Sequence, residues 1–248
     1  MEQKTDKRAL ASEATQTRLL DAAERLFAEH GLDGVSVRSI AAAAQADVAM
    51  INYHFGSKAG LFRAVFHRRA DRLNAMRLQA LGSALPRSRG RPDLERVIYA
   101  LAAPNIYLRH LPHMGGLEFG RIVVREMTDP KAQGRGLISE TFDPIVEKFM
   151  AALSEALPGA PSAALHWAYH FAIGTLIQTM ASTGRLEKLS KGACSFNDPE
   201  EVLSYLVPFI THGMAGCVRQ AGPRKARKPA VRKKTKAPVR RRAATSVS

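Results

Sequence analysis

Apolar residues near the start of the chain recur at three- and four-residue spacing, which is the period of a helix with one buried face. The first such stripe consists of Leu19, Ala22, Ala23, Leu26 and Phe27. Thr15 or Thr17 can cap the start of this helix, and Gly31 supplies the left-handed residue that commonly ends one. We therefore expect a helix from about residue 15 to His30, preceded by a flexible arm of residues 1–14.

A short second helix is predicted after this one. Ser36 can cap its start, because a serine side chain accepts a hydrogen bond from the first free amide groups of a helix. Its apolar residues, Val37, Ile40, Ala41 and Ala44, repeat at helical spacing over barely two turns. Gln45 and Ala46 then form a predicted turn.

The third predicted helix, capped by Asp47, has a predominantly polar outer face. We expect Val48, Ile51 and Phe55 to point towards the core. The residues expected on the exposed side are Ala49, Met50, Asn52, Tyr53 and His54. Two short helices joined by a tight turn are typical of the helix-turn-helix, in which the second helix enters the major groove of DNA.

Several side chains of this motif have the chemistry to contact DNA. Tyr53 and His54 offer hydrogen bonds to the backbone, although they could instead merely cap the small core. Ser57 can cap the next helix, at whose positive end the ammonium of Lys58 would attract a phosphate oxygen. The full predicted DNA surface is Ser36, Arg38, Asp47, Val48, Ala49, Met50, Asn52, Tyr53, His54 and Lys58.

The remaining pattern predicts an all-α fold in two helical domains. A helix from Lys58 to about Leu81 leads into the connection GSALPRSRGRPD. Further helices are expected over residues 93–108, 117–128, 136–157, 162–183 and 199–219, and no strand pattern competes with them. We therefore expect a DNA-binding domain over residues 15–80, which includes the connecting helix, and a larger domain over residues 81–221.

The predicted helix over residues 162–183 is apolar almost all round. One stripe contains Leu165, Tyr169, Ala172, Leu176 and Met180, and another contains Trp167, Phe171, Gly174 and Ile177. Such a helix must be buried on two sides, and a second copy of the chain is the natural partner. Together with the apolar face of residues 199–219, the helix over residues 162–183 predicts a four-helix dimer interface. Such a dimer would place two recognition helices about one DNA turn apart.

Charge is concentrated at the C-terminus. The formal net charge is +15, but residues 223–248 hold eleven Lys and Arg and no acid, while the rest has 26 basic and 22 acidic residues. This Pro-, Ala-, Lys- and Arg-rich composition predicts a disordered tail over residues 222–248, either solvated or bound to DNA without sequence preference. A nonspecific architectural DNA-binding protein driven by the tail is therefore the alternative function.

Other features limit the compartment and the class of protein. No apolar run reaches the length of a membrane span, and the first fourteen residues lack the apolar stretch of an export signal, so we expect a cytoplasmic protein. Cys194 and Cys217 are too far apart to suggest a zinc site, and we expect neither metal nor cofactor. His166 and His170 lack the glutamate of a zinc-protease helix. We interpret them as interface or core residues.

An enzyme is not supported by the motifs. Tyr53 and Lys58 are five residues apart, GGLEFG over residues 115–120 has the wrong spacing for a nucleotide loop, and no GxSxG elbow is present. His110 and His113 flank Pro112, and we interpret both as surface residues.

Residues 17–66, TRLLDAAERLFAEHGLDGVSVRSIAAAAQADVAMINYHFGSKAGLFRAVF, resemble the DNA-binding domain of the TetR family of bacterial transcriptional regulators. One departure is Gln45, where the family usually has glycine, and a left-handed residue is costlier without glycine. The resemblance implies a homodimeric repressor that binds double-stranded DNA. It also implies that a small molecule bound in the C-terminal domain releases the DNA.

The same resemblance suggests an effector site. WAYHFAIGTLIQTM and YLVPFITHGM are similar to stretches of a fatty-acid-responsive regulator, which implies a fatty acid or acyl-CoA. Aromatic and aliphatic residues would line the cavity unless they simply form core, and the arginines would meet a carboxylate or phosphate unless they are solvated. The predicted effector residues are Phe119, Arg121, Ile122, Arg125, Phe142, Trp167, His170 and Phe171.

Overall fold

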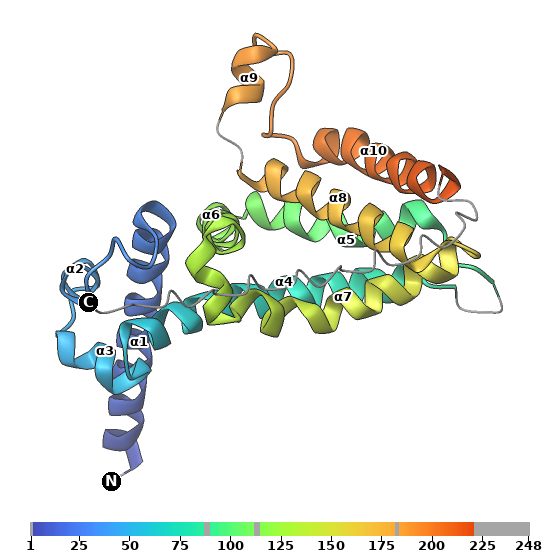
Figure 1. The fold of residues 1–248 in the computed structure, drawn as a ribbon. Helices are drawn as coiled ribbons and strands as arrows, with labels where there is room; N and C mark the ends of the chain where they lie inside the picture. Colours follow the sequence, from blue (N-terminus) through green and yellow to red (C-terminus); the bar gives the residue numbers. More distant parts are fainter. Residues whose placement is uncertain (1, 87–89, 112–114, 182–183, 221–248) are drawn as a thin grey trace, which may run out of the picture.

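The computed structural model describes residues 2–86, 90–111, 115–181 and 184–220, so the basic tail and His113 lie outside the described residues. Within these ranges the chain is helical and contains no strand (Figure 1). The helices are α1 Glu2–His30, α2 Val37–Ala43, α3 Val48–Phe55, α4 Lys58–Ala84, α5 Leu94–Arg109, α6 Gly116–Thr128, the 3-10 helix η2 Pro130–Arg135, α7 Leu137–Ala156, α8 Ser162–Ala181, α9 Arg185–Leu189 and α10 Pro199–Gln220.

The N-terminal domain packs α1, α2, α3 and the first half of α4 around one apolar core. Its fully buried side chains include Phe27, Ile40, Ile51, Leu61 and Phe66. These residues come from the helical stripes of all four helices, so each helix buries one face against the other three. The helix-turn-helix is therefore held on a rigid base.

Local hydrogen bonds define the start of each short helix, as the sequence predicts. The Ser36 hydroxyl accepts from the Ser39 amide at 3.0 Å, and the Asp47 carboxylate accepts from the Ala49 amide at 2.7 Å. Ser57 caps α4 in the same way. Gln45, in the turn between α2 and α3, has a φ of 50°, the left-handed conformation that glycine adopts at lower cost.

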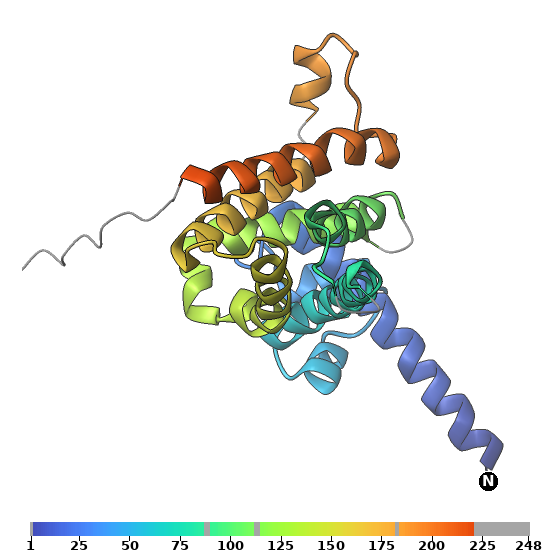
Figure 2. The same ribbon diagram turned by 90° about the vertical axis from the view of Figure 1, so that its right-hand side faces the viewer.

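The first helix is longer than predicted. It begins at Glu2, so most of residues 1–14 continue α1 in place of a flexible arm (Figure 2). Thr15 consequently lies inside the helix, where its hydroxyl donates to the carbonyl of Ala11, and caps nothing. The segment contains Ala, Glu, Gln, Lys and Arg without Gly or Pro, so its intrinsic propensity lets the helix extend beyond its packed part.

The larger domain is a bundle with a second core. Helices α5, α7, α8 and α10 pack with the second half of α4, and their buried residues include Leu81, Ile98, Leu101, Phe149 and Leu206. Figure 1 shows α4 running from the N-terminal domain along α7. Helix α6 contacts α1 on one side and α8 on the other, so it connects the two cores.

Five helices of this domain match their predicted ranges closely, but two short elements were not predicted. These are η2 and α9, whose five residues follow Gly184 in a left-handed conformation. Their patterns are too short to show a period of 3.6 residues. Helix α9 projects away from the bundle beside the start of α10 (Figure 1).

Two consecutive glycines, Gly115 and Gly116, let α6 start against the end of α5. A Cβ atom at Gly116 would lie 1.9 Å from the carbonyl oxygen of Leu108. One at Gly115 would lie 2.4 Å from Oε1 of Glu24, which is buried between α1 and α4 and pairs with Arg69. The glycines therefore permit close packing, which explains them without a nucleotide-binding loop.

Candidate nucleic-acid interface and effector cavity

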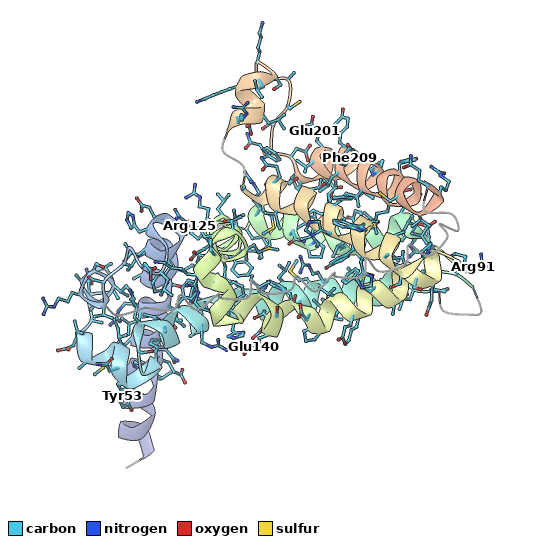
Figure 3. The ribbon with its side chains drawn as sticks, viewed as in Figure 1. Tyr53, Arg91, Arg125, Glu140, Glu201 and Phe209 are labelled. Carbon is cyan, nitrogen blue, oxygen red and sulfur yellow. The ribbon has the colours of Figure 1, made fainter. Side chains whose placement is uncertain are left out.

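Helix α3 presents a continuous exposed face. Ala49, Asn52 and Tyr53 are exposed, and Tyr53 keeps 75% of its surface accessible. Met50 and His54 are half-buried, and the imidazole of His54 packs edge-on against the Tyr53 ring at 4.9 Å. Figure 3 shows Tyr53 at the outer edge of the N-terminal domain, away from the bundle.

The predicted inward face of α3 is correct for two residues and wrong for one. Ile51 is fully buried and Phe55 packs against the core, whereas Val48 remains 37% exposed. Val48 directly follows the N-cap Asp47, in the first turn of α3, whereas Ile51 lies one turn further into the packed part of the helix. Val48 therefore joins the exposed face.

Three further predicted DNA-contact residues, Ser36, Arg38 and Asp47, are exposed. Ser36 and Asp47 are the N-caps of α2 and α3, and Arg38 lies in the first turn of α2. The side chains of Ser36 and Asp47 accept the capping hydrogen bonds, so their main effect is to orient α2 and α3. Arg38 is the exposed cation of this group.

The ammonium of Lys58 is directed into the domain. It donates hydrogen bonds of 2.9 Å to the carbonyl oxygens of Leu32 and Val35, and the side chain is part-buried. These carbonyls belong to the loop between α1 and α2, where the backbone has no helical hydrogen-bond partners to offer them. Lys58 thus joins α4 to that loop, a role that the expectation of a phosphate contact did not include.

A cavity of about 290 Å³ opens inside the larger domain, between α4, α5, α6, α7 and α8. Of the predicted effector residues, Phe142 and His170 line it. The full lining is Leu73, Arg77, Asn105, Val123, Met127, Ile138, Phe142, Asp143, Val146, Tyr169, His170, Ile173, Leu176, Ile177 and Met180. The lining is thus mostly apolar with a few polar groups, as in pockets for small organic molecules.

The other predicted effector residues lie elsewhere. Phe119 is buried in the N-terminal core, 5.5 Å from the ring of Phe66. Ile122 and Arg125 border a separate hollow between α1 and α6, where Arg125 donates to the carbonyl of Glu29 at 2.8 Å. Figure 3 shows Arg125 near this junction. Arg121 is exposed and is not part of the cavity lining.

Trp167 and Phe171 were predicted in the cavity but lie on the outer face of α8, where their rings stack at 5.7 Å. Tyr205 and Phe209 of α10 are also largely exposed. These four aromatic residues, here called the aromatic face, belong to two helices that pack against each other. Because α8 is apolar nearly all round, its period did not show which stripe faces inwards.

Helix α10 is also long and apolar enough, by composition, to cross a membrane. Its inner residues Leu203, Leu206, Val207, Ile210 and Met214 are buried in the bundle. A protein interface on one face of a packed helix therefore explains the exposed apolar residues better than a membrane span does.

Sequence reasoning missed four polar residues of the cavity, Arg77, Asn105, Asp143 and Tyr169, and the first two are bonded to each other. The Arg77 guanidinium donates to Oδ1 of Asn105 at 2.9 Å, and burial lowers the pKa of Arg77 to about 10. A signal existed: Arg77 lies on the stripe of α4 that otherwise holds Leu73, Leu81 and Ala84, where a charged residue breaks the apolar pattern.

The histidines do not form a metal site in the described part of the chain. His166 and His170 are exposed on α8, and His166 Nδ1 lies 2.7 Å from the carbonyl oxygen of Ser162. His110 was predicted to be a surface residue, and this prediction is wrong. It is half-buried, with ring nitrogens 2.8 Å and 2.6 Å from the carbonyl oxygens of Ile106 and Phe196.

Two family models match the chain. Residues 19–65 match bacterial regulatory proteins of the tetR family, and residues 99–213 match the C-terminal domain of tetracyclin repressor-like proteins. No curated protein matches the chain in sequence.

Solved structures share the fold at low identity. The fatty acid degradation regulator FadR from Bacillus halodurans has a TM-score of 0.60 and 16% identity, covering 80% of this chain and 95% of that chain. FadR from Bacillus subtilis in complex with stearoyl-CoA has a TM-score of 0.58 and 14% identity, covering 79% and 98%. A TetR-family regulator from Streptomyces coelicolor has a TM-score of 0.55 and 21% identity, covering 89% and 96%.

Proposed function

The chain belongs to the TetR family of bacterial transcriptional regulators, and we propose that it is a repressor that binds a palindromic operator as a homodimer and leaves it when a small apolar effector fills its cavity. The observation that carries the DNA-binding part is the exposed face of α3. Ala49, Asn52 and Tyr53 project from a helix that its N-cap and three packed neighbours hold in place.

On this face, the small side chain of Ala49 lets α3 approach base edges and thymine methyl groups. The Asn52 amide can donate and accept at a base edge, and the Tyr53 hydroxyl can donate to a phosphate oxygen. Met50, half-buried, contributes a flexible apolar contact. Arg38 adds a charge beside the groove.

The aromatic face supports the homodimer. Trp167, Phe171, Tyr205 and Phe209 are exposed on two adjacent helices, and large aromatic residues are typical of interface cores. A two-fold axis through this face would bury them against the same residues of a second copy. Two copies of α3 would then contact successive major grooves on one side of the DNA.

The cavity supports an acyl effector, because its walls are mostly aliphatic and a structural neighbour was solved in complex with stearoyl-CoA. The cavity is lined by α6 and by α8, the helix that carries Trp167 and Phe171 of the aromatic face. Filling it can therefore alter the position of α6, which also contacts α1. This contact is a route from the effector to the DNA-binding domain.

Genome-wide mapping of bound sites, followed by footprinting, tests the function. We expect a protected palindrome, whose affinity falls by roughly tenfold or more for Asn52→Ala, since a base contact contributes about 1–3 kcal/mol of discrimination. Thr128→Ala, at an exposed position of α6, is the control. Uniform binding to all duplexes would contradict the proposal.

The same binding assay distinguishes the proposed repressor from the alternative function, an architectural DNA-binding protein driven by the basic tail. A chain that ends at Gly222 should keep its preference for the operator and show a flatter dependence of affinity on salt, because the tail adds phosphate contacts only. Loss of all DNA binding in this shortened chain would favour the architectural function instead.

Effectors are tested by titrating fatty acids and acyl-CoAs into the protein–operator complex. We expect at least one of the two classes to release the DNA. An unchanged operator affinity with both classes would exclude the acyl effector and leave the DNA-binding part intact.

A further inference from the structure

The cavity contains a buried cation without a described anionic partner. Arg77 lines the cavity, and its one side-chain hydrogen bond among the described residues is to neutral Asn105. Its Nε–H has no acceptor in the described part of the chain, and the nearby ring of Phe142, 5.7 Å from the guanidinium carbon, offers only a cation–π contact. A buried charge in this condition is costly unless an anion pairs with it.

Burial divides the cavity into a floor and a mouth. Leu73, Asn105 and Leu176 are almost fully inaccessible and form the floor, whereas Met127, Asp143 and His170 are exposed and form the mouth. Because Arg77 is bonded to Asn105, its guanidinium belongs to the floor. The positive charge therefore lies beside the buried residues of a mostly apolar cavity.

The other polar groups of the cavity do not neutralise Arg77. Asn105 is neutral, and both ends of its side-chain amide are hydrogen-bonded. Its oxygen accepts from Arg77, and its nitrogen donates to the carbonyl of Leu101 at 2.9 Å. The hydroxyl of Tyr169, whose pKa burial raises to about 12, stays protonated at neutral pH and is a hydrogen-bond donor. Asp143 is the one acid among the described lining residues, and it is exposed at the mouth.

We infer that the effector is a free monocarboxylate with an aliphatic chain, bound with its carboxylate on Arg77 at the floor and its chain towards the mouth. This inference rests on the effector part of the proposed function and names the chemical class. The carboxylate would accept charge-assisted hydrogen bonds from Arg77, which are roughly twice as strong as neutral ones. Val123, Ile138, Ile173 and Ile177 would cover the chain.

This arrangement disfavours an acyl-CoA. The cavity of about 290 Å³ is near the lower end of the range for small-molecule pockets. A thioester brings no negative charge to the floor, so Arg77 would stay unpaired when the acyl chain of an acyl-CoA enters first. The large anionic headgroup would then lie at the mouth, next to the carboxylate of Asp143.

Calorimetry with the full chain tests the inference with three probes of one chain length: decanoate, 1-decanol and decanoyl-CoA. We expect decanoate to bind at least tenfold more tightly than 1-decanol. Arg77→Gln should lower the affinity for decanoate by roughly 10- to 100-fold, the range for removing a hydrogen bond to a charged group, while 1-decanol binds as before. Arg77→Lys, which keeps the charge, should recover part of that affinity.

Arg121→Gln is the matched control, because Arg121 is exposed and lies outside the cavity lining. It should leave the affinity for decanoate unchanged. Retained binding of 1-decanol shows that the Arg77→Gln cavity is folded. If that variant no longer binds 1-decanol, the Arg77→Lys variant decides: recovery of decanoate binding supports the inference, and no recovery overturns it.

Three results would overturn the inference: equal affinities for decanoate and 1-decanol, unchanged decanoate affinity in Arg77→Gln, or binding of decanoyl-CoA alone. The last result, with release of the operator by decanoyl-CoA, would leave the proposed acyl-responsive function standing. Absence of binding by all three probes, with operator binding intact, would remove both the inference and the acyl effector.

Discussion

The ammonium of Lys58 lies 2.9 Å from the carbonyl oxygen of Val35, so the first residue of α4 is bonded to the last buried residue before the helix-turn-helix. A second bond of equal length joins Lys58 to Leu32. The position of α2 and α3 relative to α4 therefore depends on these bonds as well as on the direct packing of α3 against α4. Any movement of α4 would be transmitted through it to the DNA-binding helices.

Lys58→Met should lower the free energy of unfolding by about 2 kcal/mol, because two carbonyl groups are deprived of a charged donor. The slope of log affinity against log salt should stay unchanged, since the ammonium is directed into the domain and bonds two loop carbonyls. Chemical denaturation and salt titrations measure the two effects. Arg38→Met is the comparison: its stability should be unchanged, and its slope should be smaller by about one for each phosphate that Arg38 binds. A smaller slope for Lys58→Met would instead show that Lys58 contacts a phosphate, as the sequence predicted.

Gln45→Gly should raise the free energy of unfolding by about 0.5–1 kcal/mol. Gln45 has a φ of 50°, and the steric cost of this conformation for a side chain exceeds the entropic cost of glycine. Thermal denaturation measures the change. A less stable variant would show that the Gln45 side chain makes a compensating contact in solution.

Gly116→Ala should destabilise the protein by at least about 2 kcal/mol, because the new Cβ would lie 1.9 Å from the Leu108 carbonyl oxygen and α6 would have to move. Gly82→Ala is the matched control: a Cβ there meets nothing within 4 Å, and alanine favours a helix. The control should be neutral or slightly stabilising. Equal stabilities of the two variants would contradict the close packing of α5 and α6.

Phe209→Glu should convert the proposed homodimer to a monomer and reduce operator affinity by at least about 100-fold, because a buried unpaired charge is costly and a monomer would contact only one half-site. Leu189→Glu is the control. Leu189 and Phe209 are both 68% exposed, but Leu189 lies on α9, outside the aromatic face. Sedimentation measures the mass. A dimeric Phe209→Glu protein would place the interface elsewhere.

The ion pair of Glu140 with Arg63, which links α7 to α4, predicts a dependence of stability on acid. The hydrogen bond from Arg63 holds the pKa of the Glu140 carboxyl below its usual range. A lowered pKa in the folded state means that the stabilisation is present above the unfolded pKa and disappears as the pH falls through the folded one. Glu140→Gln should therefore reduce the loss of stability on acidification. Glu155→Gln, at an exposed position of the same helix, should leave the loss of stability on acidification unchanged.

Periodicity and capping residues predicted the helices well because both act within a few residues. Ser36, Asp47 and Ser57 each cap the helix that follows them, and the left-handed Gly31 ends α1 as expected. The arm before residue 15 was predicted wrongly, because the prediction placed the start of α1 at a threonine although good helix formers precede it. The exposed face of α3 was predicted except for Val48.

The lining of the cavity in the larger domain was predicted less well. Of eight proposed residues, Phe142 and His170 line it, while Trp167 and Phe171 lie on the opposite face of α8. A helix that is apolar all round has the same pattern for a cavity wall, a core and an interface. Arg77 was detectable as a charge on an apolar stripe, but its partner Asn105 lies on another helix.

The sequence by itself determined the bounds of most helices, though not the start of α1 or the short elements η2 and α9, and it determined which face of α3 is mainly polar and that the chain is an all-α regulator of the TetR family. Only the tertiary structure decided that Lys58 binds two loop carbonyls, that the aromatic face of α8 and α10 points outwards, and that Arg77 lies at the floor of the cavity. The physical reason is the distance along the chain over which each interaction acts. Helix formation and capping depend on neighbours within a turn, whereas the environment of a side chain depends on helices that are distant in the chain.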